Sequence, residues 1–505
     1  MQTTVPIPHS FRLTGRRFIW LTAAWLTLSA LVLYFLGDDE VTRVAGSAVA
    51  VIVCGLMFAF FADDKFDMFS PAFFWGMNFA VFYGVAAILP FAMTPEQGSY
   101  HYVFTLGRPY YPLAALVTLF CMLFFFAGYR SKWAAQRGKR ITWFVGRTAP
   151  ENNLRLFWAI LLGMGIAAFL ALIAGGGFNQ STTEIQSPLF YSAAGFLQTG
   201  LFVAVPFAVA LALQQGAKAF WKLAAIISIG TALLFGLPSG SKTLALLGLM
   251  LLAFAWNYCR RRFSRKQALI AVFAVMGVLA VLMPFNSVYR DVLLSDSTQA
   301  SQGLATNFAM MKDAVTELGE RDPETLIDLT VGYTSQRLSN LSIVAVLLGH
   351  QRLHNDLALG DTYFRLVYVL IPRFIWPEKP PLTFGREVAV KLGLGRSEGR
   401  VLGIEMSNTS VGLTFVGEAI YNFSIYLAPL FMLLMGMFYR WLYEAIKAQQ
   451  PDSGALAVAI ACFAWYTLVF TAHESHLAAL FAGAIKFGMF LWLLQRLFKF
   501  RRQVL

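Results

Sequence analysis

Five arginines in one stretch of the chain could bind phosphate oxygens. They are Arg290, Arg337, Arg365, Arg373 and Arg386, all within residues 286–419. A guanidinium group suits phosphate because it offers a planar fork of N–H donors and keeps its charge at neutral pH. For any single arginine the alternative is that it extends to lipid headgroups or pairs with Asp or Glu. As a set, these arginines predict a site for a phosphate or diphosphate group.

Two further residues could act on a bound anion or on its reaction partner. Glu418 stands beside an apolar run in VGLTFVGEAIYNFS, where a carboxylate is costly unless it is hydrated, paired or neutralised. Such a carboxylate suits a general acid or base; the alternative is a helix-entry carboxylate favoured by the helix dipole, or the partner of an arginine. Lys242 follows a Pro-Ser-Gly-Ser turn and could bind an anion, although the GxxxxGK spacing of a P-loop is absent.

Three other groups contain residue types that bind metal ions. They are the run Asp38, Asp39 and Glu40, the pair His473 and His476, and the pair His350 and His354. His473 and His476 could bind a metal with Glu474, but the HExxH spacing is absent, and His350 and His354 have no evident third ligand. We interpret the acidic run as a solvated helix end and the histidines as surface residues. The four cysteines lie in apolar runs or at their ends, so no disulfide framework is implied. The sequence predicts no metal and no cofactor.

The composition indicates which elements position these residues. The chain is 58% hydrophobic and 13% charged, whereas a soluble domain rarely exceeds half apolar. Its apolar runs of about 18 residues or more are long enough to cross roughly 30 Å of hydrocarbon as helices. Twelve candidate spans lie at about 18–36, 45–62, 70–92, 111–129, 155–175, 190–213, 221–237, 242–258, 267–285, 420–439, 454–471 and 477–496. The sequence therefore predicts an all-α, polytopic transmembrane helical bundle.

Lysine and arginine in the short loops predict the orientation of this bundle. Under a twelve-span arrangement the basic clusters all fall on one side, and they lie at residues 12–17, 130–147, 218–222, 260–266, 440–447 and 499–502. Both termini are therefore expected in the cytoplasm. Nucleic-acid binding is a rival explanation for a net charge of +13, but the basic residues form short juxtamembrane clusters without a basic domain or an aromatic platform. No nucleic-acid partner is expected.

This orientation places one large hydrophilic segment outside the cytoplasm and divides the chain into three parts. Residues 1–285 hold the first nine spans, residues 286–419 form a large periplasmic or external loop, and residues 420–505 hold the last three spans and a cytoplasmic C-terminus. In the loop, Leu338, Leu341, Val344, Ala345 and Leu348 recur at helical spacing. Residues 363–375 are too short to span and are expected to lie in the interface or to re-enter. A short helix is expected from Arg386 to Leu392, ended by Gly393.

Several segments in order resemble those of a known family. They are GLPSGSK at 236–242, NSVYR at 286–290, PRFIWPEKP at 372–380 and NTSVGLTFVGEAIYNFS at 408–424. With the many-span layout and one dominant external loop, the chain resembles the Wzy-type polymerases, which join lipid-linked repeat units of O-antigen or exopolysaccharide. The resemblance implies a GT-C-like membrane fold, an undecaprenyl-diphosphate-linked oligosaccharide as substrate, and the bacterial inner membrane as location. A chain-length regulator protein is a further expected partner.

The expected chemistry is attack by a sugar hydroxyl on the anomeric carbon of a lipid-diphosphate-linked chain. Position by position, the resemblance assigns Arg290, Arg373 and Glu418 to the catalytic site. Arg337, Arg365, Arg386 and Lys242 are expected to bind the substrate, and Trp376 to stack on a sugar ring, although an interfacial Trp is more often a membrane anchor. The cytoplasmic loops are too short for a nucleotide-sugar transferase domain, which independently favours a lipid-linked donor.

Two other functions remain open from the sequence. An O-antigen ligase shares the architecture and the donor but transfers the finished glycan to a lipid A-core acceptor. A lipid-linked oligosaccharide flippase would also suit twelve spans. Transporters often show paired half-repeats with broken helices, and no second half of this chain matches the first.

Overall fold

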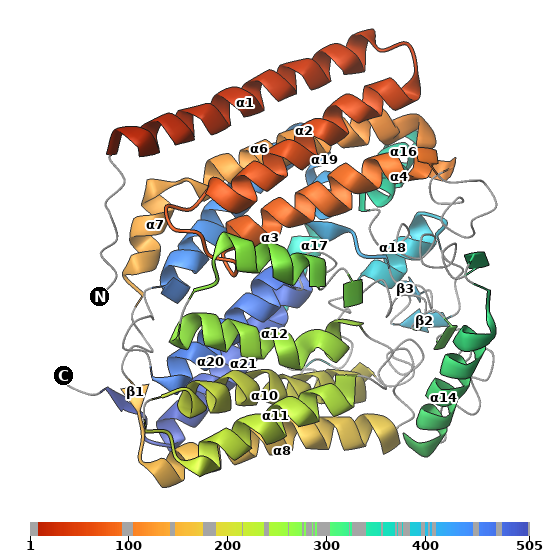
Figure 1. Ribbon diagram of the computed structural model, residues 1–505. Helices are drawn as coiled ribbons and strands as arrows, with labels where there is room; N and C mark the ends of the chain where they lie inside the picture. Colours follow the sequence, from red (N-terminus) through yellow and green to blue (C-terminus); the bar gives the residue numbers. More distant parts are fainter. Residues whose placement is uncertain are drawn as a thin grey trace. The chain divides into compact units, whose positions relative to one another are not determined.

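A computed structural model describes most of the 505-residue chain. The described residues are 9–92, 105–141, 147–174, 188–214, 216–236, 242–260, 262–274, 277–278, 285, 288–289, 304–322, 324–325, 340–354, 357–368, 371, 376, 384–394, 399–401, 404–406, 411–447, 454–470 and 477–502. Nearly all of them are helical (Figure 1). Extended backbone is confined, in these ranges, to two short antiparallel pairs.

Nine helices within the described ranges are long and apolar enough to cross a membrane, as expected for a multi-pass membrane protein. They are Arg17–Leu36, Glu40–Phe61, Pro71–Phe91, Thr105–Tyr129, Glu151–Leu172, Ala193–Ala212, Ala219–Gly236, Thr414–Lys447 and Leu480–Leu497. Two more expected spans correspond to shorter apolar helices, Leu246–Cys259 and Ala455–Phe470. The remaining expected span, 267–285, lies partly outside the described residues.

The chain divides into two compact units, and each combines segments that are distant in sequence. Unit 1 comprises residues 1–134, 335–359 and 415–440, and unit 2 comprises residues 135–334, 360–414 and 441–505. The three-part linear division of the sequence at residues 285 and 419 does not coincide with these boundaries. Two helices belong to both units, namely α7 (Lys132–Lys139) and α19 (Thr414–Lys447).

Unit 1 is built from hydrophobic helices, and one of them shows how the sequence starts a helix. Its elements are α1 (His9–Leu36), α2 (Glu40–Phe61), α3 (Pro71–Asn78), a π-helical stretch (Phe79–Val85), α4 (Ala86–Ala92), a 3₁₀ turn (Arg108–Tyr110), α6 (Tyr111–Tyr129), α16 (Asn340–His354) and most of α19. Ser70 caps α3 by accepting a 3.1 Å hydrogen bond from the N–H of Phe73, and Pro71 suits the first helical turn because its missing N–H needs no partner there.

Small residues let the helices of unit 1 approach closely, as at many membrane helix interfaces. Gly55 of α2 lies against Gly76 of α3, where a Cβ would come within 2.7 Å of the facing carbonyl oxygen. Further along α3 and its π-helical continuation, Gly84 lies against Ile52 of α2. Because later positions of one helix meet earlier positions of the other, α2 and α3 run antiparallel.

Unit 2 is a second helical bundle arranged around α10. Its helices are α8 (Glu151–Ala174), α10 (Pro188–Ala212), α11 (Ala219–Gly236), α12 (Lys242–Cys259), α14 (Leu304–Glu320), α17 (Asp361–Tyr368), α18 (Gly385–Lys391), α20 (Ala455–Trp465), a π-helical stretch (Tyr466–Phe470) and α21 (Leu477–Leu497). Helix α10 packs against α8, α11, α12 and α20 (Figure 1). Its strands are β1 (Arg147–Thr148), paired with β4 (Arg501–Arg502), and β2 (Gly399–Val401), paired with β3 (Ile404–Met406).

Two helices expected within the large hydrophilic segment are confirmed. Helix α16 buries the apolar stripe expected from its spacing, since Leu341, Val344 and Ala345 are fully buried. Helix α18 begins one residue before Arg386 and ends at Lys391. Gly393 follows with φ +69, a left-handed conformation that glycine adopts without steric cost.

Candidate functional site: a buried glutamate on a folded-back helix

Helix α19 is a hairpin of two arms rather than one straight helix. At Ser424 the backbone has φ 62 and ψ 179, which is outside the helical region and separates residues 414–423 from residues 425–447. The ring centroids of Phe423 and Phe431 are 5.6 Å apart, and those of Phe415 and Tyr439 are 6.1 Å apart. Early residues of the first arm thus meet late residues of the second, so the first arm folds back antiparallel along the second.

Glu418 lies on this first arm and is fully buried, with 0% of its surface exposed. The side-chain amide of Asn422, also fully buried, donates a 2.8 Å hydrogen bond to the backbone carbonyl of Glu418. From the sequence, Glu418 is expected at the external end of the span at 420–439, and the contacts of the first arm place it elsewhere. Because the chain reverses at Ser424, Glu418 lies in the interior of unit 1, one turn after Phe415, which stacks on Trp75 at 5.4 Å.

One end of the α19 hairpin is fixed by a partly buried ion pair. Arg440 Nη1 lies 2.8 Å from the Oδ1 atom of Asp63, whose side chain is only 8% exposed. The Tyr129 hydroxyl donates to the same carboxylate at 3.3 Å, and the guanidinium lies 5.3 Å above the Tyr129 ring. The ends of α2, α6 and the second arm therefore meet at this ion pair.

The first arm is also held by the segment that contains α16. The side-chain amide of Gln351 donates to the Ile420 carbonyl at 2.8 Å. The N–H of Ala358 donates to the Tyr421 carbonyl at 3.0 Å. These two bonds engage backbone carbonyls immediately after Glu418, so they fix the depth and rotation of the helix that presents it.

Helical register places another polar side chain in the layer of Glu418. The second arm and α2 both end near the Asp63–Arg440 pair. Because the first arm is antiparallel to the second arm and α3 is antiparallel to α2, the first arm and α3 both lead away from this pair. Trp75 and Phe415 stack, and one turn further along each helix come Asn78 and Glu418. Asn78 is 4% exposed, and neither atom of its amide has a hydrogen-bond partner among the described residues.

A second polar group without a hydrogen-bond partner lies on the same side of α6 as the aromatic cluster. Thr118 is fully buried and stands two turns before Phe125, whose ring is 5.5 Å from that of Trp75. Its hydroxyl has no partner within the part of the chain that is described. Buried polar groups are nearly always hydrogen-bonded in proteins. Asn78 and Thr118 therefore provide hydrogen-bonding capacity for water or a ligand inside unit 1.

The arginines placed in unit 2 occupy a different cluster, between α17 and α18. Arg365 is buried, and its Nη2 atom lies 3.1 Å from the carboxylate of Glu387 and 3.3 Å from that of Asp361. Lys391 shares Glu387 at 3.3 Å. Arg365 thus makes the ion pairs that the sequence left open as an alternative. Arg386, next to Glu387, is also buried, at 6% exposure.

Helix α17 shows which of its faces is turned outward. Phe364 and Val367 are 63% and 64% exposed, whereas Thr362 and Arg365 are buried. An outward apolar face with an inward polar face is expected where the surroundings are lipid rather than water. The buried Arg365 thus lies on the opposite face of α17 from the exposed apolar side chains of Phe364 and Val367. The expectation that residues 363–375 lie in the interface or re-enter stays a prediction.

Of the other site residues predicted from the sequence, the structure describes only some. Arg290, Arg337 and Arg373 lie outside the described residues. Lys242 is the first residue of α12, but its side chain is not among those described. Trp376 is half-buried, and its ring meets that of Tyr368 edge-on at 5.4 Å.

The structure describes the contacts of the acidic run and of one histidine pair. Asp39 caps α2, accepting hydrogen bonds from the N–H and the hydroxyl of Thr42. Glu40 pairs with Arg108 at 2.9 Å. The rings of His350 and His354 are 4.6 Å apart on α16, while His473 and His476 lie outside the described residues. Within the described ranges, no three His, Cys, Asp or Glu side chains form a group that could hold a metal ion.

Sequence reasoning missed three polar residues of unit 1. Asn422 follows Glu418 by four residues, a spacing that puts two side chains on one helix face. Asn78 and Thr118 each interrupt a long apolar run, and a polar residue inside a membrane helix commonly bonds across helices. Both signals were present in the sequence, but neither showed that Asn78 lies in the layer of Glu418 or that Thr118 lies on the α6 face that meets the aromatic cluster.

Scans of this chain against protein-family models, curated proteins and solved structures found no match.

Proposed function

We propose that this protein is a membrane glycosyltransferase that polymerises undecaprenyl-diphosphate-linked oligosaccharide repeat units, in the manner of the Wzy-type polymerases that its motifs resemble. The observation that carries this proposal is the complete burial of Glu418 on a helix folded back into an apolar bundle. An ionisable side chain in such surroundings is expensive and is therefore a functional candidate by default.

Glu418 is proposed as the general base. The acceptor hydroxyl attacks the anomeric carbon of the donor sugar, Glu418 takes the hydroxyl proton, and the lipid diphosphate leaves. An acceptor sugar reaches Glu418 only if the residues that bury Glu418 move. The first arm is joined to the second through Ser424, whose left-handed φ is a sparsely populated conformation for a residue with a side chain. Motion of the first arm about Ser424 would expose the carboxylate.

Arginines are proposed to stabilise the charge that develops on the departing diphosphate. Arg290 and Arg373 take this role by the resemblance of their motifs, and Arg337, Arg365, Arg386 and Lys242 assist in binding. The lipid-compatible face of α17 supports a lipid-linked donor, because the buried Arg365 is held behind exposed Phe364 and Val367. Trp376, half-buried beside Tyr368, is proposed to contact a sugar ring.

The finer architecture forms part of the same proposal. The nine long apolar helices and two shorter ones among the described residues are compatible with about twelve spans in a GT-C-like bundle. Basic short loops support cytoplasmic termini in a bacterial inner membrane. Because the basic cluster at 440–447 lies on that side, Glu418, one turn from the Phe415–Tyr439 contact, lies nearer the cytoplasmic end of unit 1, so chemistry at the periplasmic face requires the proposed motion of the first arm. A chain-length regulator is the proposed protein partner.

The test is elongation of a purified lipid-linked repeat unit by the purified protein. Ladders of lipid-linked products support a polymerase. Transfer of a preformed chain only to a lipid A-core acceptor would identify a ligase. Movement of the repeat unit across a vesicle membrane without any new glycosidic bond would identify a flippase and contradict the proposal.

A further inference from the structure

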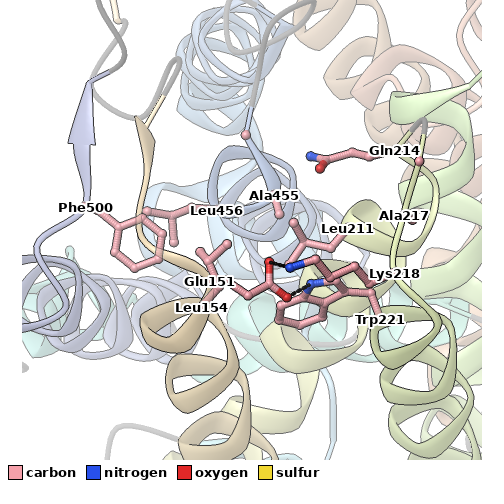
Figure 2. Close-up of a pocket in the computed structure, with 12 residues that line it drawn as sticks. Glu151, Leu154, Leu211, Gln214, Ala217, Lys218, Trp221, Ala455, Leu456 and Phe500 are labelled. Carbon is pink, nitrogen blue, oxygen red and sulfur yellow. Dashed lines mark hydrogen bonds and ion pairs between the residues drawn. The ribbon is translucent and has the colours of Figure 1, made fainter.

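Unit 2 contains a cavity of about 200 Å³ near one end of its helical bundle (Figure 2). The start of α8, the end of α10, the start of α11, the start of α20 and the C-terminal segment surround it. Its polar wall is formed by Glu151, Lys218 and Trp221, and its apolar wall includes Leu211, Ala455 and Phe500. Figure 2 shows the Lys218 ammonium and the Trp221 indole nitrogen side by side, each joined to one oxygen of the Glu151 carboxylate.

Two cations contact the Glu151 carboxylate, of which Lys218 lines the cavity and Arg155 does not. Glu151 accepts hydrogen bonds from Trp221 Nε1 at 3.1 Å and from Arg155 Nε at 3.2 Å, and Lys218 Nζ lies 3.6 Å away. The side chains of Lys218 and Arg155 are 61% and 40% exposed. Exposed Lys222 follows Trp221 directly in the chain. These side chains together therefore retain a positive charge that can attract an anion.

Apolar side chains exposed on α8 and α11 distinguish a lipid from a free anion. Leu156 follows Arg155 and is 54% exposed, while Leu223 and Ile226, just after Lys222, are 56% and 66% exposed. A cationic cavity that opens beside an exposed apolar helix face matches a molecule with a phosphate and acyl chains. Basic pockets between membrane helices on the cytoplasmic side commonly bind anionic lipid headgroups.

We propose that this cavity seats the headgroup phosphate of an anionic phospholipid. Lys218 and Arg155 neutralise the phosphate, Glu151 orients both cations, and the apolar faces of α8 and α11 accept the acyl chains. The proposal is independent of glycan transfer, because it concerns only the helices and the C-terminal segment of unit 2.

Native mass spectrometry of the purified full-length protein tests the proposal, using phosphatidylglycerol, phosphatidylcholine and inorganic phosphate as probes. We expect binding of phosphatidylglycerol well above that of phosphatidylcholine, and no competition by phosphate. Lys218→Gln should weaken phosphatidylglycerol binding roughly fivefold, the effect of one juxtamembrane charge. Lys218→Arg should retain it. The matched control is Lys266→Gln, which removes another exposed lysine of unit 2 outside the cavity.

A second variant separates a seated headgroup from diffuse attraction to a basic surface. Ala217 lines the cavity, so Ala217→Phe fills it without changing the charge. We expect this variant to lose phosphatidylglycerol as well. Equal binding by the filled cavity, equal losses in the Lys218→Gln and Lys266→Gln variants, or displacement of the lipid by inorganic phosphate would each overturn the proposal.

Discussion

Replacing Gly436 by alanine should separate the α19 hairpin from α6. Gly436 faces α6 so closely that an added Cβ would overlap the Phe125 carbonyl oxygen and lie 2.8 Å from the Tyr129 nitrogen. Ordinary contact begins at 3.4 Å, and the overlap with the Phe125 carbonyl oxygen is more severe than the contact with the Tyr129 nitrogen, so the two helices must move apart to admit the Cβ. Because the clash is with backbone atoms, no side-chain rotation relieves it. Overpacking of this kind costs about 1–3 kcal/mol, and we expect the upper part of that range.

The assay is unfolding of the purified protein in detergent, followed by the loss of its monodisperse elution peak on heating. The matched control is Gly163→Ala on α8, since a Cβ at Gly163 meets nothing within 4 Å. Alanine there should be neutral or slightly stabilising, because it is the better helix former. If Gly436→Ala were as stable as wild type, the close crossing of α6 and α19 would be refuted. Equal destabilisation by both variants would also count against it, since the crowding would then not be specific.

Two further perturbations probe the ends of unit 1. Arg440→Gln should destabilise the protein by about 3 kcal/mol in the same unfolding assay, because it leaves the largely buried Asp63 carboxylate without its cation. The double variant Arg440→Gln/Asp63→Asn should recover most of that loss, and an unchanged or larger loss would contradict the pairing. Hydrogen bonds from the Thr42 N–H and then its hydroxyl hold the pKa of Asp39 below its ordinary 3.8. The stabilisation is therefore present above the unfolded pKa and is lost as the pH falls through the lower folded value, so Asp39→Asn should flatten the pH dependence of unfolding below about pH 4. An unaltered acid-side profile would count against this cap.

Apolar runs predicted most of the described spans to within a few residues because the signal is local. A helix that crosses hydrocarbon needs a fixed length of apolar sequence, and α2, α6, α8 and α21 each supply it. The burial of α16 was likewise readable, since its apolar residues recur at helical spacing.

The fold-back of α19 was not predictable in the same way. Ser424 stands in a continuous apolar run, and Pro429, the residue that usually signals a kink, comes five positions later. The reversal is visible only through contacts such as Phe415 with Tyr439. The depth of Glu418 depends on that reversal, so sequence periodicity assigned it to the wrong level of the bundle.

The ion pairs of Arg365 are another feature that the sequence did not predict. Composition indicated that an arginine in this segment either binds a ligand or pairs with a carboxylate. Its partner Glu387 is 22 residues away, across residues that include several prolines. The choice between partners depends on how α17 packs on α18, which local spacing does not encode. The buried amide of Asn78 is a similar case, since its layer is set by the packing of α3 against other helices.

The most direct test of the central claim is the elongation rate of a purified lipid-linked repeat unit by the Glu418→Gln variant. The substitution preserves size and hydrogen bonding but removes the proton acceptor, and general-base catalysis typically contributes about 10²–10⁴-fold. The matched control is Glu444→Gln, which makes the same change at another buried glutamate of α19. We expect Glu418→Gln to lose at least about a hundredfold in rate while Glu444→Gln elongates normally. Undiminished elongation by a correctly folded Glu418→Gln protein would contradict the account.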